Sequence, residues 1–350
     1  MVKVKKIDEC NEVVGPGELV ETLHELCPFY YWPNDGNLGD YLIAEATRQF
    51  FRRNHLTWKE YSPEEPPSDD SYHLVYGGGG RFVSHWGGIE LFEAHLSNPR
   101  VRRCVVLPHS IQGVDSLVKA FDSRHVVFCR EQKSLAYCCS LNSRAAFRLA
   151  HDMGLCLQVA DLPGLDSIAP VGNDADEESR LQYELLTGGS VAHARYRMTR
   201  ATIQNAARRF SFVLRSDKEK SIRAESEWAY DVSILYSASC RETAYSAQLV
   251  YLMADILRST DVVVTDRLHV AIMAMHVGKE VYMLDNDYGK LSGVYELSLK
   301  GRANVHLLPP GEPWPVELQR AWAKLNSPWR NGYFAARAMA GRILRKIKGK

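Results

Sequence analysis

Short apolar runs alternate with helix-patterned segments along most of the chain. Runs of four or five mostly apolar residues predict buried strands at residues 73–76, 104–107, 126–129, 210–214, 261–264 and 280–284. Helical spacing of apolar residues predicts helices at residues 41–51, 132–140, 248–258 and 269–276. This alternation is typical of parallel sheets with crossover helices, so we predict an α/β fold.

The length of the chain and one polar stretch suggest how the fold is divided. A chain of 350 residues exceeds what one core ordinarily serves, so two domains are expected. Residues 161–180 are polar, contain Pro163 and Pro170, and indicate a linker or surface loop, and residues 181–209 could form a helix pair. We therefore predict an N-terminal α/β domain at 1–165, a linker with connecting helices at 166–209 and a C-terminal α/β domain at 210–330.

The last segment, residues 331–350, has a different pattern. Apolar residues recur at helical spacing, at Tyr333, Ala336, Ala340, Ile343, Leu344 and Ile347, and basic residues fill most positions between them. A basic amphipathic helix of this kind can lie on an anionic membrane surface. It can also pack on the protein and keep its charges in water, and the sequence leaves both readings open.

Composition narrows the classes of function. Hydrophobic residues make up 45% of the chain and charged residues 24%, which is typical of a globular protein. Lys and Arg number 43 against 42 Asp and Glu, so bulk charge gives no support for a nucleic-acid partner. No run is long enough for a transmembrane helix, and the basic N-terminus lacks the apolar segment of a secretory signal. The eight cysteines show no C-x-x-C spacing, which favours reduced thiols in a cytoplasm over zinc ligands or disulfides.

The most informative motif is Thr-Asp-Arg-Leu-His at residues 265–269, between a predicted strand and a predicted helix. In open α/β folds, ligands bind at the carboxyl edge of the sheet, where such a junction lies. Arg267 provides a permanent bidentate cation, and His269 provides a proton that moves near neutral pH. The motif therefore predicts a site for an anionic substrate that needs acid–base help.

Two further strand ends offer cations. Arg215 follows the predicted strand 210–214 in a position equivalent to that of Arg267, and two arginines at neighbouring strand ends suit a ligand with two anionic groups. Lys290 follows the strand 280–284 and is another candidate anion contact. Asp285 and Asp287 in the same loop resemble a D-x-D metal site only superficially, so we predict no metal.

The N-terminal half offers candidates for sugar contacts. Asn37 and Asp40 precede the predicted helix 41–51, where Asp40 is placed to cap the helix or to act as a base. The glycines at 77–80 follow a strand and form either a flexible turn or room for a ligand against bare backbone. We predict acceptor contacts at this run, specifically Gly78, Gly79 and Gly80.

The next two strand ends are less distinctive. His109 and Gln112 follow the predicted strand 104–107 and could bind sugar hydroxyls, although a lone histidine is as often structural. Arg130 and Glu131 follow the strand 126–129, and we expect these two residues to pair with each other.

In this order, the motifs resemble those of the polysaccharide pyruvyl transferase family. The matching segments are 37–40, 77–80, 129–131, Asp152, 265–269 and 288–290, and together they span about residues 30–300. The resemblance implies two Rossmann-like domains arranged as in GT-B glycosyltransferases, with a cleft between them. It also implies transfer of pyruvate from phosphoenolpyruvate to two hydroxyls of a sugar, which gives a cyclic ketal. By this resemblance Arg215, Arg267, Leu268 and His269 would hold the donor.

The residues agree with the chemistry that the resemblance implies. The donor carries a carboxylate and a phosphate, which suit Arg215, Arg267 and Lys290. His269 is the candidate acid for the donor methylene carbon, and Asp40 is the candidate base for a sugar hydroxyl. The scheme needs no cofactor and no metal.

The basic tail suggests the partner and the location. It motivates a lipid-linked acceptor, the repeat unit of an exopolysaccharide, and a cytoplasmic protein at the inner face of the cell membrane. Two other functions remain open from the sequence. One is a nucleotide-sugar glycosyltransferase of the GT-B class, and the other is a saccharide-binding protein without catalysis.

Overall fold

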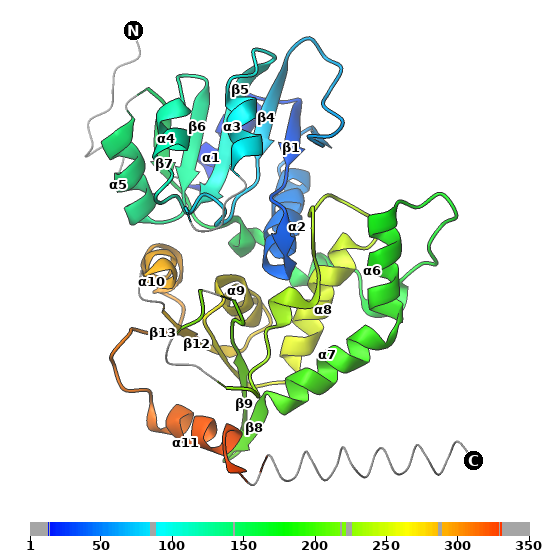
Figure 1. Ribbon diagram of the computed structural model, residues 1–350, viewed down its shortest axis with the longest axis vertical. Coiled ribbons are helices and arrows are strands. Elements are labelled where there is room, and N and C mark those ends of the chain that lie inside the picture. The colour runs from blue at the N-terminus through cyan, green and yellow to red at the C-terminus, as the bar shows by residue number, and fades with distance from the viewer. Residues whose placement is uncertain are drawn as a thin grey trace.

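Two mainly parallel sheets, each accompanied by helices, form the bulk of the molecule (Figure 1). The computed structural model describes residues 13, 15–84, 89–142, 144–217, 219–221, 226–285, 289–328 and 330. The predicted α/β fold class is confirmed. The tail at 331–350, which we predicted to be a basic helix, lies outside the described residues.

The N-terminal sheet has six parallel strands in the order β3-β1-β4-β5-β6-β7. Its strands are β1 (Phe29–Trp32), β3 (Trp58–Glu60), β4 (Tyr72–Tyr76), β5 (Val101–His109), β6 (His125–Cys129) and β7 (Ala146–Leu149). Its helices are α1 (Pro16–His24), α2 (Leu38–Arg53), α3 (Glu90–Leu96), α4 (Asp115–Ala120) and α5 (Gln132–Leu141).

The C-terminal sheet has five strands in the order β13-β12-β11-β9-β8, and only the edge strand β8 is antiparallel. Its strands are β8 (Thr202–Asn205), β9 (Arg208–Val213), β11 (Val262–Thr265), β12 (Glu280–Leu284) and β13 (Val305–Leu308). Its helices are α6 (Glu177–Thr187), α7 (Gly189–Arg200), α8 (Ser246–Arg258), α9 (Leu268–His276), α10 (Lys290–Val294) and α11 (Val316–Leu325). The 3-10 turn η5 (Val232–Leu235) and the π-turn η6 (Tyr295–Leu299) complete this half.

All six predicted strands and all four predicted helices are present, with boundaries moved by a few residues. The largest difference among the strands is in β5, which runs on to His109. The predicted helix pair before the second sheet is present as α6 and α7, but the segment after Arg200 forms β8. The connecting segment that we predicted at 166–209 therefore includes the edge strand of the C-terminal sheet.

Helix α2 belongs to the cores of both halves (Figure 1). Ile43, Phe50 and Phe51 pack in one cluster with the strands of the N-terminal sheet. Leu38 and Leu42 are fully buried in another cluster, together with side chains of α8 and α9. Because nearly the whole circumference of α2 is buried, this helix fixes one sheet against the other.

Two polar contacts reinforce this arrangement. The guanidinium group of Arg48 on α2 is fully buried and donates to both carboxylate oxygens of Glu60, each at 3.0 Å, and to the carbonyl of Cys240 at 2.7 Å. A short antiparallel ribbon pairs β2 (Gly36–Asn37) with β10 (Ser237–Ala238). The Arg48–Cys240 hydrogen bond and the ribbon each join residues that are about two hundred positions apart, so the two halves are held together at more than one point.

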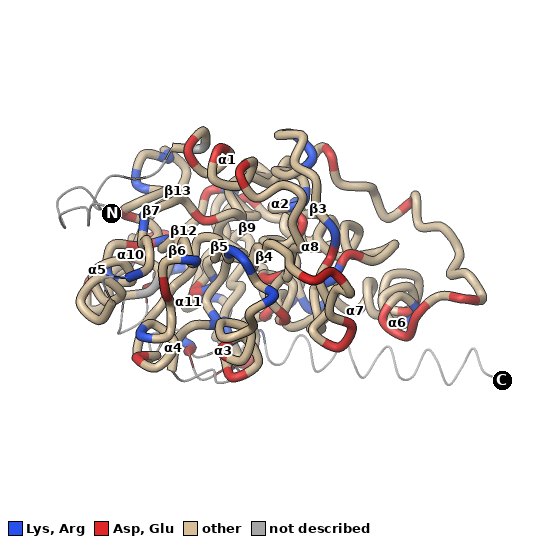
Figure 2. Tube along the Cα trace, turned by 90° about the horizontal axis from the view of Figure 1, so that it is seen from above, with Lys and Arg blue, Asp and Glu red and all other residues tan. Residues whose placement is uncertain are grey.

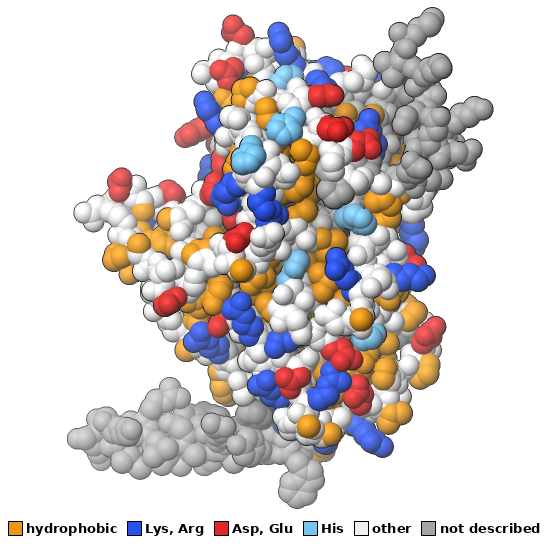
Figure 3. Space-filling view, turned by 180° about the vertical axis from the view of Figure 1, so that it is seen from behind, with side chains coloured by type: hydrophobic (Ala, Val, Ile, Leu, Met, Phe, Trp, Pro, Cys, Tyr) orange, Lys and Arg blue, Asp and Glu red, His pale blue; other side chains and the backbone are white. Residues whose placement is uncertain are grey.

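The surface carries both signs of charge. Basic and acidic positions are interspersed along the chain, and the rear face mixes both kinds with hydrophobic side chains (Figures 2 and 3). No helix in the described ranges has the length and apolar character needed to cross a bilayer. Each cysteine within those ranges has a free thiol.

Candidate active site

The carboxyl ends of strands from both sheets meet around a cavity of about 380 Å³. The loop after β1, the turn after β4 and the residue after β6 form one wall, and the residues after β9 and β11 form the other. The lining residues are Asp35, Gly36, Asn37, Gly39, Asp40, Gly80, Arg81, Arg130, Arg215, Glu219, Ser233, Ser237, Arg267, Leu268, His269 and Leu291. Four arginines in one small cavity indicate an anion-binding site.

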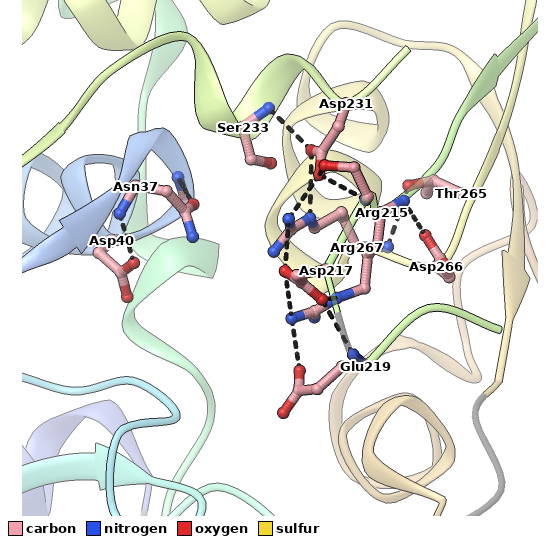
Figure 4. Close-up of polar contacts among 12 residues, drawn as sticks. Asn37, Asp40, Arg215, Asp217, Glu219, Asp231, Ser233, Thr265, Asp266 and Arg267 are labelled. Atoms are coloured by element: carbon pink, nitrogen blue, oxygen red, sulfur yellow. Dashed lines mark hydrogen bonds and ion pairs between the residues drawn. The ribbon is translucent and has the colours of Figure 1, made fainter. Parts of the chain in front are cut away.

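The guanidinium groups of Arg215 and Arg267 converge on one carboxylate oxygen (Figure 4). Oδ2 of Asp217 lies 3.0 Å from a terminal nitrogen of Arg215 and 2.8 Å from one of Arg267. Both guanidinium groups are nearly buried. Burial alone would raise the pKa of the Asp217 carboxyl, but the two cations hold it below its ordinary value.

Other carboxylates orient each arginine. Glu219 contacts Arg215 at 2.6 Å, and Asp231 binds Arg267 through two pairs of atoms, at 2.5 and 3.2 Å. Asp266 accepts from the backbone N–H of Arg215 at 2.8 Å and from that of Ser221 at 2.9 Å. Burial raises the pKa of Asp266 above its ordinary value, although both backbone donors oppose the shift. Asp266 therefore acts as a buried anchor for the loop that carries Arg215.

His269 lies at the start of α9 and faces a carboxylate from the other sheet. Its Nε2 is 3.6 Å from Oδ2 of Asp152, which follows β7. This nitrogen is buried and forms no hydrogen bond within the described structure. Gly39 provides the space for the imidazole, because a methyl group at that position would lie 2.9 Å from Nδ1 of His269.

Asp152 is itself held by Arg130. Nη1 of Arg130 donates to Oδ2 of Asp152 at 2.8 Å, and the N–H of Gly154 donates to Oδ1 at 2.8 Å. Burial would raise the pKa of Asp152, but His269 and Arg130 hold it well below its ordinary value. A negative charge therefore lies beside the imidazole. The predicted pairing of Arg130 with Glu131 is present at 3.8 Å, but it is the weaker of the two ion pairs.

Asn37 and Asp40 form a reciprocal cap at the start of α2. The Asn37 side chain accepts from the N–H of Gly39 at 2.8 Å, and Asp40 accepts from the N–H of Asn37 at 2.9 Å. Asn37 is thus the N-cap residue, and Asp40 lies one turn further on. Both residues line the cavity on the side opposite Arg215 and Arg267 (Figure 4).

The glycine run after β4 serves mainly to pack two strands closely. The N–H of Gly79 donates to the carbonyl of Pro108, and a methyl group on Gly78 would lie 2.8 Å from the same oxygen. Gly79 has φ of +146°, which disfavours any other residue. Of the three glycines that we predicted to contact an acceptor, only Gly80 lines the cavity, because Gly78 faces the backbone of Pro108 and Gly79 faces the side chain of Asn34.

His109 and Gln112 are not brought to this cavity. His109 is the last residue of β5, is fully buried, stacks on Phe82 and accepts from the N–H of Arg81 at 3.2 Å. It therefore supports the turn after β4 instead of facing a ligand. Gln112 lines a separate small cavity of about 120 Å³ with Lys133 and Tyr137.

The remaining predicted donor contacts come from α9 and α10. Leu268 is buried and lines the cavity directly beside Arg267. Lys290 begins α10, but its side chain is not among the described parts of the structure. Asp287 and Tyr288 lie outside the described residues. Asp285 accepts from the N–H of Leu291 at 3.1 Å and so caps α10. Nowhere in the described ranges do three or more His, Cys, Asp or Glu side chains form a group that could hold a metal ion.

Several residues of the site were not predicted. Arg81 directly follows the glycine run and could have been noticed on that ground. The carboxylates Asp217, Glu219 and Asp231 gave no signal, because acidic residues near arginines are common in loops. Ser233 and Ser237 gave none either, since the ribbon that brings Ser237 beside Asn37 has only two residues in each strand.

A protein-family model matches most of the chain. The family model for polysaccharide pyruvyl transferase matches residues 37–288, which include Asn37, Asp152 and His269. The chain belongs to the polysaccharide pyruvyl transferase family. As a member it is a transferase, and the family's reaction is the transfer of pyruvyl groups to polysaccharide.

A solved structure is similar to this protein over most of both chains. It is the crystal structure of a functionally uncharacterized protein from Klebsiella pneumoniae, with 26% sequence identity and a TM-score of 0.62. The match covers 83% of this pyruvyl transferase and 96% of the Klebsiella chain. This similarity supports the mixed α/β fold. No curated protein matches the chain significantly.

Proposed function

We propose that the protein transfers pyruvate from phosphoenolpyruvate to two hydroxyls of one saccharide, forms a cyclic ketal and releases phosphate. The observation that carries this proposal is the convergence of Arg215 and Arg267 on one carboxylate oxygen. A pair of guanidinium groups that binds the carboxylate of Asp217 is suited to the carboxylate of a small donor. Arg130 and Arg81 provide further positive charge in the same cavity for the donor phosphate.

His269 is the proposed acid for the donor. The methylene carbon of phosphoenolpyruvate must gain a proton before its C2 becomes electrophilic. The carboxylate of Asp152 lies 3.6 Å from Nε2 of His269, where it can orient the imidazole. Arg130 holds Asp152 in place, so the three residues act as one unit.

The acceptor is proposed to approach from the α2 side, where Asp40 is the candidate base. One sugar hydroxyl attacks C2 and gives its proton to Asp40, while C3 has taken its proton from His269. The C2–O bond to phosphate then breaks, the second hydroxyl attacks C2, and its proton leaves with the phosphate. The positive charge of the arginines stabilises the departing anion.

We also propose a domain arrangement, a class of acceptor and a location for the protein. The two sheets would be two domains in a GT-B-like arrangement, with the donor on the C-terminal side and the acceptor on the N-terminal side of the cavity. The acceptor would be a lipid-linked repeat unit of an exopolysaccharide. The basic pattern at residues 331–350 supports contact with the inner membrane face.

The test is release of phosphate from phosphoenolpyruvate over a panel of galactosides, glucosides and N-acetylmannosaminides. We expect release only with an acceptor, and a carboxyethylidene ketal in the product by mass spectrometry. His269→Ala should lower kcat at least about a hundredfold, as expected for removal of a general acid. His24→Ala, on an exposed helix face far along the chain from the site, is the matched control.

Two results would overturn the proposal. One is full activity of His269→Ala with wild-type folding. The other is thermal stabilisation by a nucleoside diphosphate with no response to phosphoenolpyruvate, which would indicate a nucleotide-sugar donor.

A further inference from the structure

A second cavity lies next to the candidate active site. Its volume is about 670 Å³, and Arg215 lines both cavities. Turn η5 separates them, because Ser233 faces the first cavity and Ile234 and Leu235 face the second. A volume of about 670 Å³ lies within the range typical of sites for small molecules.

One face of α7 supplies the far wall of this cavity. Ser190, His193, Ala194 and Arg197 all line it, and their spacing of three, four and seven positions places them on one side of the helix. The guanidinium group of Arg197 is half-buried and lies 5.6 Å from the ring centre of Tyr230. Neither His193 nor Arg197 forms an ion pair with a carboxylate of the described residues.

The cation that remains for a ligand is mainly Arg197. Arg215 already pairs with Asp217 and Glu219, Lys220 is exposed at the edge, and the acidic lining residues are Asp231 and Glu227. Asp231 is buried and its oxygens accept from Arg267 and from the N–H groups of Ser216 and Ser233, so it is occupied within the protein. Glu227 is exposed at the rim, where solvent screens its charge.

Apolar side chains complete the lining. Leu185 and Leu235 are partly exposed to the cavity, and the side chain of Ile234 is 55% exposed. A ligand that matches this lining carries an anionic group for α7 beside an apolar portion for η5.

The position of the cavity indicates which substrate would extend into it. The first cavity, at about 380 Å³, is near the lower end of the range for small-molecule sites, and the donor together with one sugar ring would fill it. Any part of the acceptor beyond that ring must leave the first cavity, and the second cavity is directly adjacent at Arg215.

We propose that the second cavity binds a diphosphate group attached to the acceptor, with Arg197 and His193 as its main ligands. This inference rests on the proposed function, because it extends the same acceptor. The diphosphate could belong to a lipid carrier or to a carrier without a lipid. The apolar residues of η5 favour a lipid carrier.

The experiment compares three forms of the sugar that is preferred in the panel. They are the methyl glycoside, the 1-diphosphate and the 1-diphosphate esterified with a short isoprenyl chain. For the wild type we expect KM to be at least tenfold lower for both diphosphates than for the methyl glycoside. Arg197→Gln should raise KM for the diphosphates at least tenfold more than KM for the methyl glycoside.

Arg195→Gln is the matched control, because Arg195 lies on the same helix, is 55% exposed and pairs with Asp255. His193 is an exposed residue on the same face of α7. The variant His193→Gln therefore provides the same test if Arg197→Gln does not fold. A lower KM for the isoprenyl form than for the free diphosphate, lost in Ile234→Ser, supports the lipid source. Equal KM values for the two diphosphates support the anion site and assign it to a carrier without a lipid.

The proposal is overturned if the wild type does not distinguish the diphosphates from the methyl glycoside. It is also overturned if Arg195→Gln and Arg197→Gln have equal effects on the diphosphate acceptors. Failure of the proposed function has a different signature, since then none of the three acceptors releases phosphate from phosphoenolpyruvate.

Discussion

Oδ2 of Asp152 lies 3.6 Å from Nε2 of His269, although the two residues come from different sheets. The carboxylate follows β7 of the N-terminal sheet, and the histidine begins α9 of the C-terminal half. The proposed proton donor and the charge that supports it are therefore joined only in the folded chain.

Asp152→Asn should lower kcat by about tenfold to a thousandfold, because the imidazole of His269 loses the carboxylate that faces it. The measurement is kcat for phosphate release at a fixed pH near neutrality. Asp255→Asn, on α8 where the carboxylate pairs with Arg195 of α7, is the control. Wild-type kcat in Asp152→Asn would remove the supporting role.

The same substitution should change stability in acid. The pKa of Asp152 is lowered in the folded protein, so this carboxylate adds to the free energy of unfolding above the unfolded-state pKa of about 3.9. That contribution is lost as the pH falls toward the folded-state pKa. Wild type should therefore lose stability more steeply than Asp152→Asn from about pH 5 downward, as measured by urea denaturation. Parallel curves for the two proteins would contradict this expectation.

Asp217→Asn should lower KM for phosphoenolpyruvate several-fold. In the structure Asp217 occupies both arginines, and a donor carboxylate must compete with it. The neutral amide competes less well, because it carries no negative charge to attract the two guanidinium groups. Steady-state kinetics with varied donor give the answer, and Asp255→Asn again serves as control. A raised KM would show that Asp217 positions the arginines more than it blocks them.

Gly39→Ala should lower kcat at least tenfold while leaving the melting temperature nearly unchanged. The added methyl group would lie 2.9 Å from Nδ1 of His269 and 3.0 Å from Oδ1 of Asn37, so the imidazole must move. Gly189→Ala, at the start of α7 with nothing within 4 Å of the added methyl group, is the matched control. Wild-type kcat in Gly39→Ala would show that the position of the imidazole matters little.

Strands β4, β5, β6, β9, β11 and β12 were predictable because they are short apolar runs bounded by polar residues. The other strands of the two sheets, β1, β3, β7, β8 and β13, were not predicted. Residues of the site could be predicted only where the reactive side chains lie within one short motif, as those of Arg267 and His269 do. Arg130 was assigned to its neighbour Glu131, because its partner Asp152 becomes adjacent only when β6 and β7 pair in parallel. His109 was expected just after a strand, but β5 extends to include it as its last residue, and its ring is buried. Long-range pairing of this kind depends on topology, which local patterns do not contain.

Helix α2 contributes core residues to both sheets, so neither half of the chain carries a complete interior of its own. A fragment with only the N-terminal sheet would expose Leu38 and Leu42 to water, and the complementary fragment would lack them. We expect the molecule to melt in a single calorimetric transition, and the two fragments to recover structure only when they are produced together. During synthesis, the first half must therefore wait for the second before either becomes stable.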